Sequence, residues 1–220
     1  MTLHETKAPP EKNGEPTTRD AILEAALDLF AQRGYHATSM REIAAEVPIR
    51  AAGIYYWFAN KEAILLELER FFLDDLNSAV IDAVSHHKNP ATRLAAAVRE
   101  HVRFHGLFPR AAFVTDSELR ALSGDDRIEI QAKRDAYQAM FIGFIEDGVR
   151  AGVFKASDVK IVSYAILLEC TGVAIWFAPN GTRTLEEVAE IHIELVLGSL
   201  MTPRATIAKA IRDTRTNVVA

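Results

Sequence analysis

The chain has 220 residues, of which 49% are hydrophobic and 25% are charged. A chain of this size and composition can bury a substantial core, which favours one large or two modest folded domains and excludes a wholly disordered protein. The single cysteine, Cys170, excludes an intrachain disulfide and a cysteine metal cluster, and it suits a reducing cytoplasm. The formal net charge of -5 means that any nucleic-acid-binding surface must be a local one.

The first 16 residues are polar, contain Pro9, Pro10 and Pro16, and lack the apolar core of a signal peptide. We expect residues 1–16 to form a disordered arm. The longest apolar stretch, residues 161–177, is shorter than the ~20 residues of a membrane span and contains Glu169. It is therefore expected to be a buried helix, and no membrane partner is expected.

The first predicted helix begins at Thr17 or Thr18 and ends near Arg33, where Gly34 can terminate it. Ser39 and Glu42 have the spacing of a capping box, which predicts a second helix from there to about Val47, before Pro48 stops it. A third helix is expected from Arg50 to Phe58, with Ile54 and Phe58 on its buried side. Two short helices joined by a tight turn are the outline of a helix-turn-helix, whose second helix enters the DNA major groove.

A long helix is expected over residues 61–85, with Asn60 as its N-cap. After a break at 86–90, further helices are predicted over 91–107, 108–122, 125–151, 157–179 and 184–201, separated by Gly or Pro. No strand pattern appears, so the predicted fold class is all-α. The expected division is an arm (1–16), a helix-turn-helix domain (17–63), a larger helical domain (64–202) and a flexible tail (203–220).

Four consecutive aromatic residues, from Tyr55 to Phe58, end the third predicted helix. A single helix cannot bury four consecutive side chains on one face. Phe58 is assigned to the core, whereas Tyr55, Tyr56 and Trp57 are expected to face outward. The alternative is that all four are core residues of a small helical domain.

The segment from Thr17 to about Leu68 resembles the N-terminal domain of the TetR family of transcriptional regulators. It shares an amphipathic helix, a capped second helix, a turn, and a recognition helix that ends in aromatic residues before Lys61 and Glu62. The chain departs from the family pattern at Pro48, where the turn usually has glycine, and at Arg50, where a small hydroxyl residue is usual. The resemblance implies a DNA-binding transcriptional regulator. We expect a repressor that a small hydrophobic effector releases from a palindromic operator, because a symmetric dimer presents two recognition helices.

The resemblance also implies site residues. Contacts to phosphates of double-stranded DNA fall to Thr38, Ser39, Tyr55, Trp57 and Lys61, and positions nearest the base edges fall to Arg41, Arg50, Ala51, Ala52, Gly53 and Tyr56. Hydroxyl, phenol and indole groups and a helix N-terminus all donate hydrogen bonds to phosphate oxygens, which agrees with the first group.

The larger domain is expected to bind a small hydrophobic effector. The candidate residues are aromatic, soft or polar side chains on several predicted helices: His101, Phe104, His105, Phe108, Phe113, Tyr137, Met140, Phe141, Phe144, Glu169 and Trp176. The alternative is an ordinary core, which is the more frequent role of aromatic residues at helical spacing. The runs HVRFHGLFPRAAFVTDSELRAL and YQAMFIGFIEDGVRAGVF resemble the sensor domains of TetR-type regulators of fatty-acid or sterol breakdown, which implies an acyl-CoA effector. A drug-like hydrophobic molecule would suit the same lining.

His101 and His105 have a spacing that can bind zinc, but the sequence offers no clear third ligand, so neither a metal nor a cofactor is expected. Glu169 lies in an apolar run, where pairing with an arginine is the first expectation.

The last two helices are expected to form a homodimer. Residues 157–179 are apolar nearly all round and must be covered on both sides, which a second subunit can do together with residues 184–201. The resemblance implies the same, because TetR-like regulators dimerise through their final helices.

The competing classes are a helical enzyme and a scaffold that binds only protein. The chain has no nucleophile elbow, no Gly-rich phosphate loop and no HExxH motif, so no catalytic residue is assigned and an enzyme is not expected. A scaffold would not need the arrangement from Tyr55 to Lys61.

Overall fold

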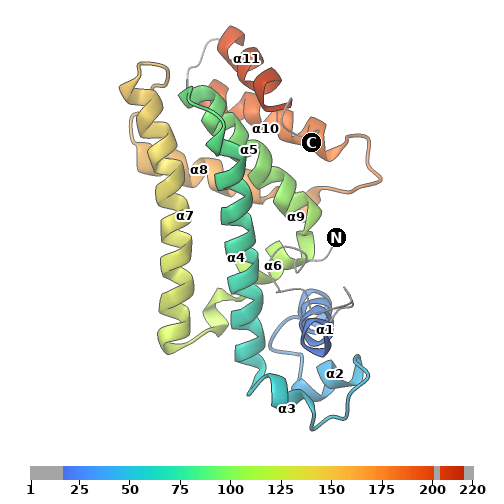
Figure 1. Cartoon of the computed structure of the whole chain (residues 1–220). Helices are drawn as coiled ribbons and strands as arrows, with labels where there is room; N and C mark the ends of the chain where they lie inside the picture. Colours follow the sequence, from blue (N-terminus) through green and yellow to red (C-terminus); the bar gives the residue numbers. More distant parts are fainter. Residues whose placement is uncertain (1–16, 201–203, 216–220) are drawn as a thin grey trace. The chain divides into compact units, whose positions relative to one another are not determined.

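The computed structural model describes residues 17–200 and 204–215, so the expected N-terminal arm lies outside the described residues. In this part of the chain all regular elements are helices, which confirms the all-α prediction (Figure 1). The chain divides into two compact units. The first comprises Met1–Asp75 and Arg110–Lys133, and the second comprises Leu76–Pro109 and Arg134–Ala220.

Unit 1 contains α1 (Thr18–Arg33), α2 (Met40–Ala45), α3 (Ile54–Trp57), the 3-10 helix η1 (Leu119–Ala121) and parts of α4 (Lys61–Ser85), α6 (Pro109–Glu118) and α7 (Gly124–Arg150). Its core holds fully buried apolar side chains from the first four helices: Ile22, Phe30, Ile43, Ile54, Ile64 and Leu65. Partly exposed ion pairs join α4 to α7, among them Arg70 with Glu129 and Lys133 with Asp74, which is 2.6 Å away. The segment 110–133 therefore belongs with the N-terminal helices, although the expected boundary at 63 separated them.

Unit 2 contains the remaining parts of α4 and α7 together with α5 (Pro90–Leu107), α8 (Val159–Thr171), α9 (Val173–Trp176), α10 (Leu185–Ser199) and α11 (Arg204–Arg215). Helix α5 is buried along most of its length and packs against α10 and α11. Its small side chains permit close approach. A Cβ atom on Gly106 would lie 2.4 Å from a methyl carbon of Leu185, so a larger residue here would require the Leu185 side chain to shift.

The chain after residue 203 differs from the flexible tail that we expected. Residues 204–215 form α11, which packs on α5 and α10 (Figure 1). The buried guanidinium of Arg99 on α5 donates from Nε to Thr214 Oγ1 at 2.9 Å, and Thr214 and Ala210 are themselves buried. Because this segment contains many basic residues, the sequence did not reveal that one side of it is buried. Residues 216–220 lie outside the described part of the chain.

The prediction of one continuous buried helix over 161–177 was also wrong. The segment consists of α8 and α9, which meet at Gly172, and only part of it is buried. By length and composition alone, residues 159–176 could cross a membrane, but core helices of soluble proteins pass the same test. Glu169 is exposed to solvent, so it does not require the arginine partner that a buried charge would need.

Candidate nucleic-acid interface and ligand core

Helix α3 presents its aromatic residues as expected. Tyr55, Tyr56 and Trp57 are 55%, 84% and 39% exposed, whereas Ile54 and Phe58 are buried. The rings of Tyr56 and Trp57 meet edge to face, with centroids 5.2 Å apart. Large aromatic side chains left in water without a partner mark an interaction surface. This row, Tyr55–Tyr56–Trp57, is called the aromatic row below.

Helices α2 and α3 are shorter than predicted. Helix α2 ends at Ala45, before Pro48, and α3 has only four residues and begins at Ile54, not at Arg50. Arg50 instead opens a turn in which its carbonyl accepts a hydrogen bond from Gly53 N at 2.7 Å. A Cβ atom on Gly53 would lie 3.1 Å from that carbonyl oxygen, which explains the glycine.

The predicted base-reading residues are accessible. Arg41, Arg50, Ala51 and Ala52 are exposed, and Gly53 is partly exposed. The two arginines supply long donors and the alanines supply methyl groups, which are the groups suited to guanine and thymine contacts in a major groove.

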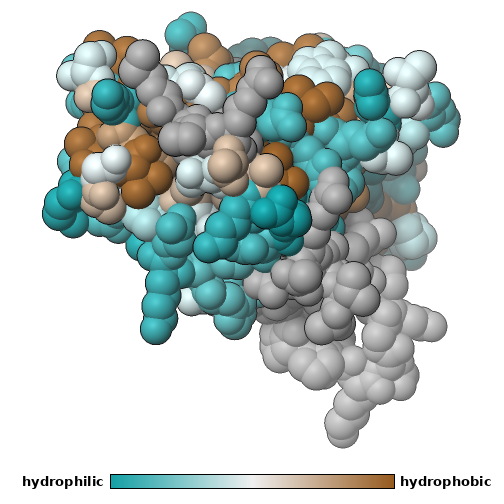
Figure 2. Space-filling view, turned by 90° about the horizontal axis from the view of Figure 1, so that it is seen from above, coloured by the Kyte–Doolittle hydropathy of each residue, from teal (hydrophilic) through white to brown (hydrophobic). Residues whose placement is uncertain are grey.

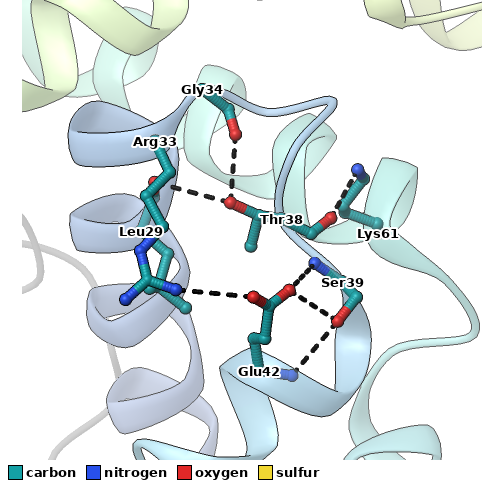
Figure 3. Close-up of polar contacts among 7 residues, drawn as sticks. All are labelled: Leu29, Arg33, Gly34, Thr38, Ser39, Glu42 and Lys61. Carbon is teal, nitrogen blue, oxygen red and sulfur yellow. Dashed lines mark hydrogen bonds and ion pairs between the residues drawn. The ribbon is translucent and has the colours of Figure 1, made fainter.

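Ser39 and Glu42 form the predicted capping box at the start of α2 (Figure 3). Glu42 N donates to Ser39 Oγ, and the Ser39 hydroxyl and amide donate to Glu42 Oε2 at 2.7 and 2.8 Å. These hydrogen bonds, helped by Arg33 nearby, lower the pKa of the Glu42 carboxyl. The box fixes the N-terminus of α2 and leaves the Ser39 side chain at the exposed surface.

Thr38 and Lys61 differ from the expectation that their polar ends face a phosphate. Thr38 is buried, and its hydroxyl donates to Gly34 O at 3.0 Å and to Leu29 O at 3.4 Å (Figure 3). Lys61 Nζ donates to Tyr35 O at 2.5 Å and to Thr38 O at 2.7 Å. The Tyr35 contact could not be predicted because it joins residues 26 positions apart. The predicted cap of α4 is confirmed, since Ala63 N donates to Asn60 Oδ1 at 2.8 Å.

The candidate effector residues of unit 2 include a packed cluster around His101. Its Nδ1 lies 2.8 Å from the Tyr137 hydroxyl, and its Nε2 lies 3.1 Å from Thr171 Oγ1. The His101 ring stacks on His105 with centroids 4.1 Å apart, and Tyr137 and Phe141 pack against it. His101 therefore joins α5, α7 and α8 through one side chain. Thr171 was not among the predicted residues, because no sequence pattern pairs it with His101.

Burial controls the protonation of this cluster. Burial, with smaller effects of His105 and His192, holds the pKa of His101 well below its ordinary value. Burial likewise raises the pKa of the Tyr137 hydroxyl well above its usual range. The cluster therefore places neutral hydrogen-bonding groups within an apolar surrounding.

The other candidate effector residues are not all brought together. Phe104 and Phe108 contact each other at 4.9 Å between centroids, and Phe144 contacts Phe141. Met140 is partly buried, but Glu169 and Trp176 are exposed. Phe113 belongs to unit 1 and is also exposed.

An open hollow of about 350 Å³ lies between α9, the following loop and α10. Trp176 and His192 stack in its wall with centroids 6.1 Å apart, and Arg183 lies at its loop side. From the sequence, Trp176 was expected in the effector site and residues 184–201, which include His192, in the dimer surface, so this pairing was not predicted.

Comparisons with known proteins agree for both parts of the chain. Residues 22–68 match the family of bacterial regulatory proteins named tetR, and residues 87–200 match the tetracyclin repressor-like C-terminal domain. The HTH-type transcriptional repressor KstR2 of Rhodococcus jostii (strain RHA1) is 28% identical over 196 residues, which cover 88% of this chain and 96% of the relative. KstR2 of Mycobacterium tuberculosis (strain ATCC 25618 / H37Rv) is 30% identical over 188 residues, which cover 83% and 92%.

A solved structure is similar as well. The crystal structure of AibR in complex with isovaleryl coenzyme A and operator DNA is 27% identical, has a TM-score of 0.75, and covers 81% of this chain and 97% of AibR. The matched domains span the aromatic row and the helices that carry the His101 cluster. The chain therefore belongs to the tetR family, and it is a DNA-binding transcriptional regulator and not an enzyme.

Proposed function

We propose that the protein is a cytoplasmic homodimeric repressor that binds a palindromic operator and leaves it when an acyl-CoA thioester binds. The observation that carries DNA binding is the aromatic row on α3, which is exposed although Ile54 of the same helix and Phe58 directly after it are buried. The name of KstR2 as a repressor and the complex of AibR with isovaleryl coenzyme A and operator DNA support the rest.

The proposed DNA contacts divide by chemistry. Tyr55, Trp57, Ser39 and the amides at the start of α4 donate to phosphates and set the register of the protein on the duplex. Tyr56, Arg41, Arg50 and the small residues Ala51, Ala52 and Gly53 lie toward the base edges. Because only the two arginines among these residues can form bidentate pairs with guanine, we expect few base contacts and a modest specificity.

The proposed dimer surface lies on α8, α9 and α10. It consists of large apolar side chains that are exposed in the single chain: Ile161, Tyr164, Leu168, Ile175, Trp176, Ile191 and Leu195. Figure 2 shows that hydrophobic residues also reach the surface in patches on the face seen from above. A second copy would remove the α8 to α10 side chains from water, and its twofold symmetry would place two recognition helices about 34 Å apart, one turn of B-DNA.

The proposed effector site is the His101 cluster with Phe104, His105, Phe108, Tyr137, Met140, Phe141 and Phe144. Apolar rings suit an acyl chain, and the neutral His101, Tyr137 and Thr171 groups can exchange their mutual hydrogen bonds for bonds to a thioester carbonyl. An effector that does so favours a different packing of α5, α7 and α8, and this shift in population is the proposed route to release.

The test is Tyr56→Ala. Removal of an exposed ring at the centre of the interface should weaken binding to a duplex from the upstream region of the protein's own gene by about tenfold, or about 1.4 kcal/mol. Fluorescence anisotropy measures the affinity, and sedimentation velocity checks that the dimer persists. An acyl-CoA thioester added to the wild-type complex should release the duplex, whereas free coenzyme A should not.

Phe113→Ala is the matched control, because it removes an exposed ring from α6 of the same unit. It should bind the duplex as the wild type does. Equal binding by Tyr56→Ala and the wild type would refute the proposed docking of α3.

A further inference from the structure

We infer that Lys61 is a positioning residue for DNA binding: its ammonium group ties the first turn of α4 to the connection between α1 and α2, and it does not neutralise a phosphate. The inference rests on the proposed DNA-binding function, but it changes the role that the family resemblance implies for this side chain. All the groups involved belong to unit 1.

The ammonium of Lys61 is occupied on several sides. It donates to the carbonyls of Tyr35 and Thr38 at 2.5 and 2.7 Å, and it lies 4.1 Å from the centre of the Tyr35 ring. A lysine ammonium has three donors, and two of them are used here. Burial lowers the pKa of Lys61, so the surrounding protein has replaced part of its water shell. A DNA phosphate would have to break these contacts before it could use the charge.

The carbonyls that Lys61 binds lie at the point where three helices meet. The Thr38 hydroxyl holds the last turn of α1 through Leu29 O and Gly34 O, and Ser39, the next residue, caps α2 (Figure 3). Lys61 adds α4 to this junction. The Tyr35 ring completes it by packing edge to face on Phe30 of α1, 5.1 Å away.

The junction also continues along α4. Glu62, the neighbour of Lys61, accepts hydrogen bonds from the Ser123 amide and hydroxyl at 2.7 Å each, just before α7 begins. The first turn of α4 is thus held on one side by the connection between α1 and α2 and on the other by the segment before α7. A displacement of this turn would move the start of α2, and with it the surface that reads DNA.

Lys61→Met separates the two roles, since it keeps the length of the side chain and removes its charge and donors. A phosphate contact contributes about one unit to the slope of log K against log salt concentration, whereas a positioning residue contributes nothing to the slope. We expect the variant to bind the duplex about tenfold more weakly, as for the loss of hydrogen bonds from a charged group, with the wild-type slope. In the free protein, the amides of residues 34–39 should exchange with deuterium faster than in the wild type.

Arg127→Met is the matched control, because it removes one positive charge from an exposed position on α7 of the same unit. In Arg127→Met, the amides of residues 34–39 should exchange with deuterium as fast as in the wild type. Circular dichroism should show that both variants are folded. The inference would be overturned if Lys61→Met reduced the slope of log K against log salt concentration by about one and left the deuterium exchange of residues 34–39 unchanged. Lys61 would then be a phosphate contact. Unchanged affinity and exchange would overturn it as well.

The hydrogen-exchange result does not depend on DNA. If the wild type itself showed no salt-dependent binding to any duplex, the proposed function would fail, while faster exchange in Lys61→Met would still establish the tie between α4 and residues 34–39. Lys61→Gln provides a second variant that keeps a donor, and the amides of residues 34–39 should exchange more slowly in it than in Lys61→Met.

Discussion

At the scale of single residues, the polar side chains of this protein divide into those exposed on its surface and those used inside it. His101 is the clearest internal case, because both ring nitrogens have partners and burial keeps its pKa well below the ordinary value of 6.5. The imidazole is therefore neutral in the folded protein at neutral pH. Protonation would require Tyr137 and Thr171 to rearrange and would place a charge in an apolar surrounding.

The protonation state of His101 predicts a dependence of stability on pH. The unfolded chain takes up a proton on this residue below about pH 6.5, whereas the folded protein does not until its lowered pKa is reached. The contribution of His101 is thus fully present above pH 6.5 and is lost as the pH falls, by up to about 1.4 kcal/mol for each pH unit. Urea unfolding at pH 7.5 and 5.5 should show this loss in the wild type and a smaller loss in His101→Gln.

His86→Gln is the control, since His86 is exposed on the surface. It should retain the wild-type loss. Both variants keep Glu100, whose pKa burial raises, so its opposite contribution cancels in the comparison. Equal losses in all three proteins would show that His101 titrates normally.

Residues whose role depends on near neighbours could be predicted from the sequence. The Ser39–Glu42 cap, the Asn60 cap and the opposite orientations of Ile54 and Tyr56 all follow from spacings of two to four positions. The roles of Lys61 and Thr171 could not, because each depends on a contact across a long stretch of chain. In the sequence, a lysine next to an exposed aromatic row is indistinguishable from a phosphate contact. The sequence does not reveal that two backbone carbonyls already bind its ammonium group.

At the scale of elements, helix α11 shows how a buried arginine can retain a terminal helix. Arg99 donates to Thr214 Oγ1 and forms an ion pair with Glu186 of α10, so one guanidinium links α5, α10 and α11. The periodic patterns of α1, α4, α5, α7 and α10 predicted the positions of these helices well. In α11 the charged residues are as numerous as the apolar ones, and only the packing on α5 reveals the buried side.

Thr214→Val should weaken the attachment of α11. The substitution keeps the shape of the side chain but leaves a buried charged donor without its acceptor, which costs about 1–3 kcal/mol. Limited proteolysis within residues 204–215 should become faster, and the free energy of unfolding in urea should fall. Thr206→Val makes the same change at a half-exposed position of α11 and should affect neither measurement. If both variants behaved alike, Arg99 would not hold the helix.

At the scale of the whole molecule, we propose that the apolar surface on α8, α9 and α10 determines the assembly. The sequence predicted that residues 157–179 need more cover than one neighbouring helix provides, and the exposed side chains of α8 and α9 agree with that reasoning. It could not predict the break at Gly172, which leaves Ile175 and Trp176 on a separate short helix. The resulting surface is what we propose a second copy covers.

Leu168→Asp tests this assembly, because Leu168 is 77% exposed in the single chain and lies within the proposed dimer surface. A twofold interface would bury two aspartates, each at a cost of several kcal/mol unless it is paired, so the dimer should dissociate more than a hundredfold more easily. Sedimentation velocity measures this change. Ile128→Asp introduces the same charge at a position on α7 that is 67% exposed and outside the surface, and it should leave the dimer intact. A dimer that survives Leu168→Asp but not Ile128→Asp would place the interface elsewhere, and the twofold spacing of the recognition helices would then need a different origin.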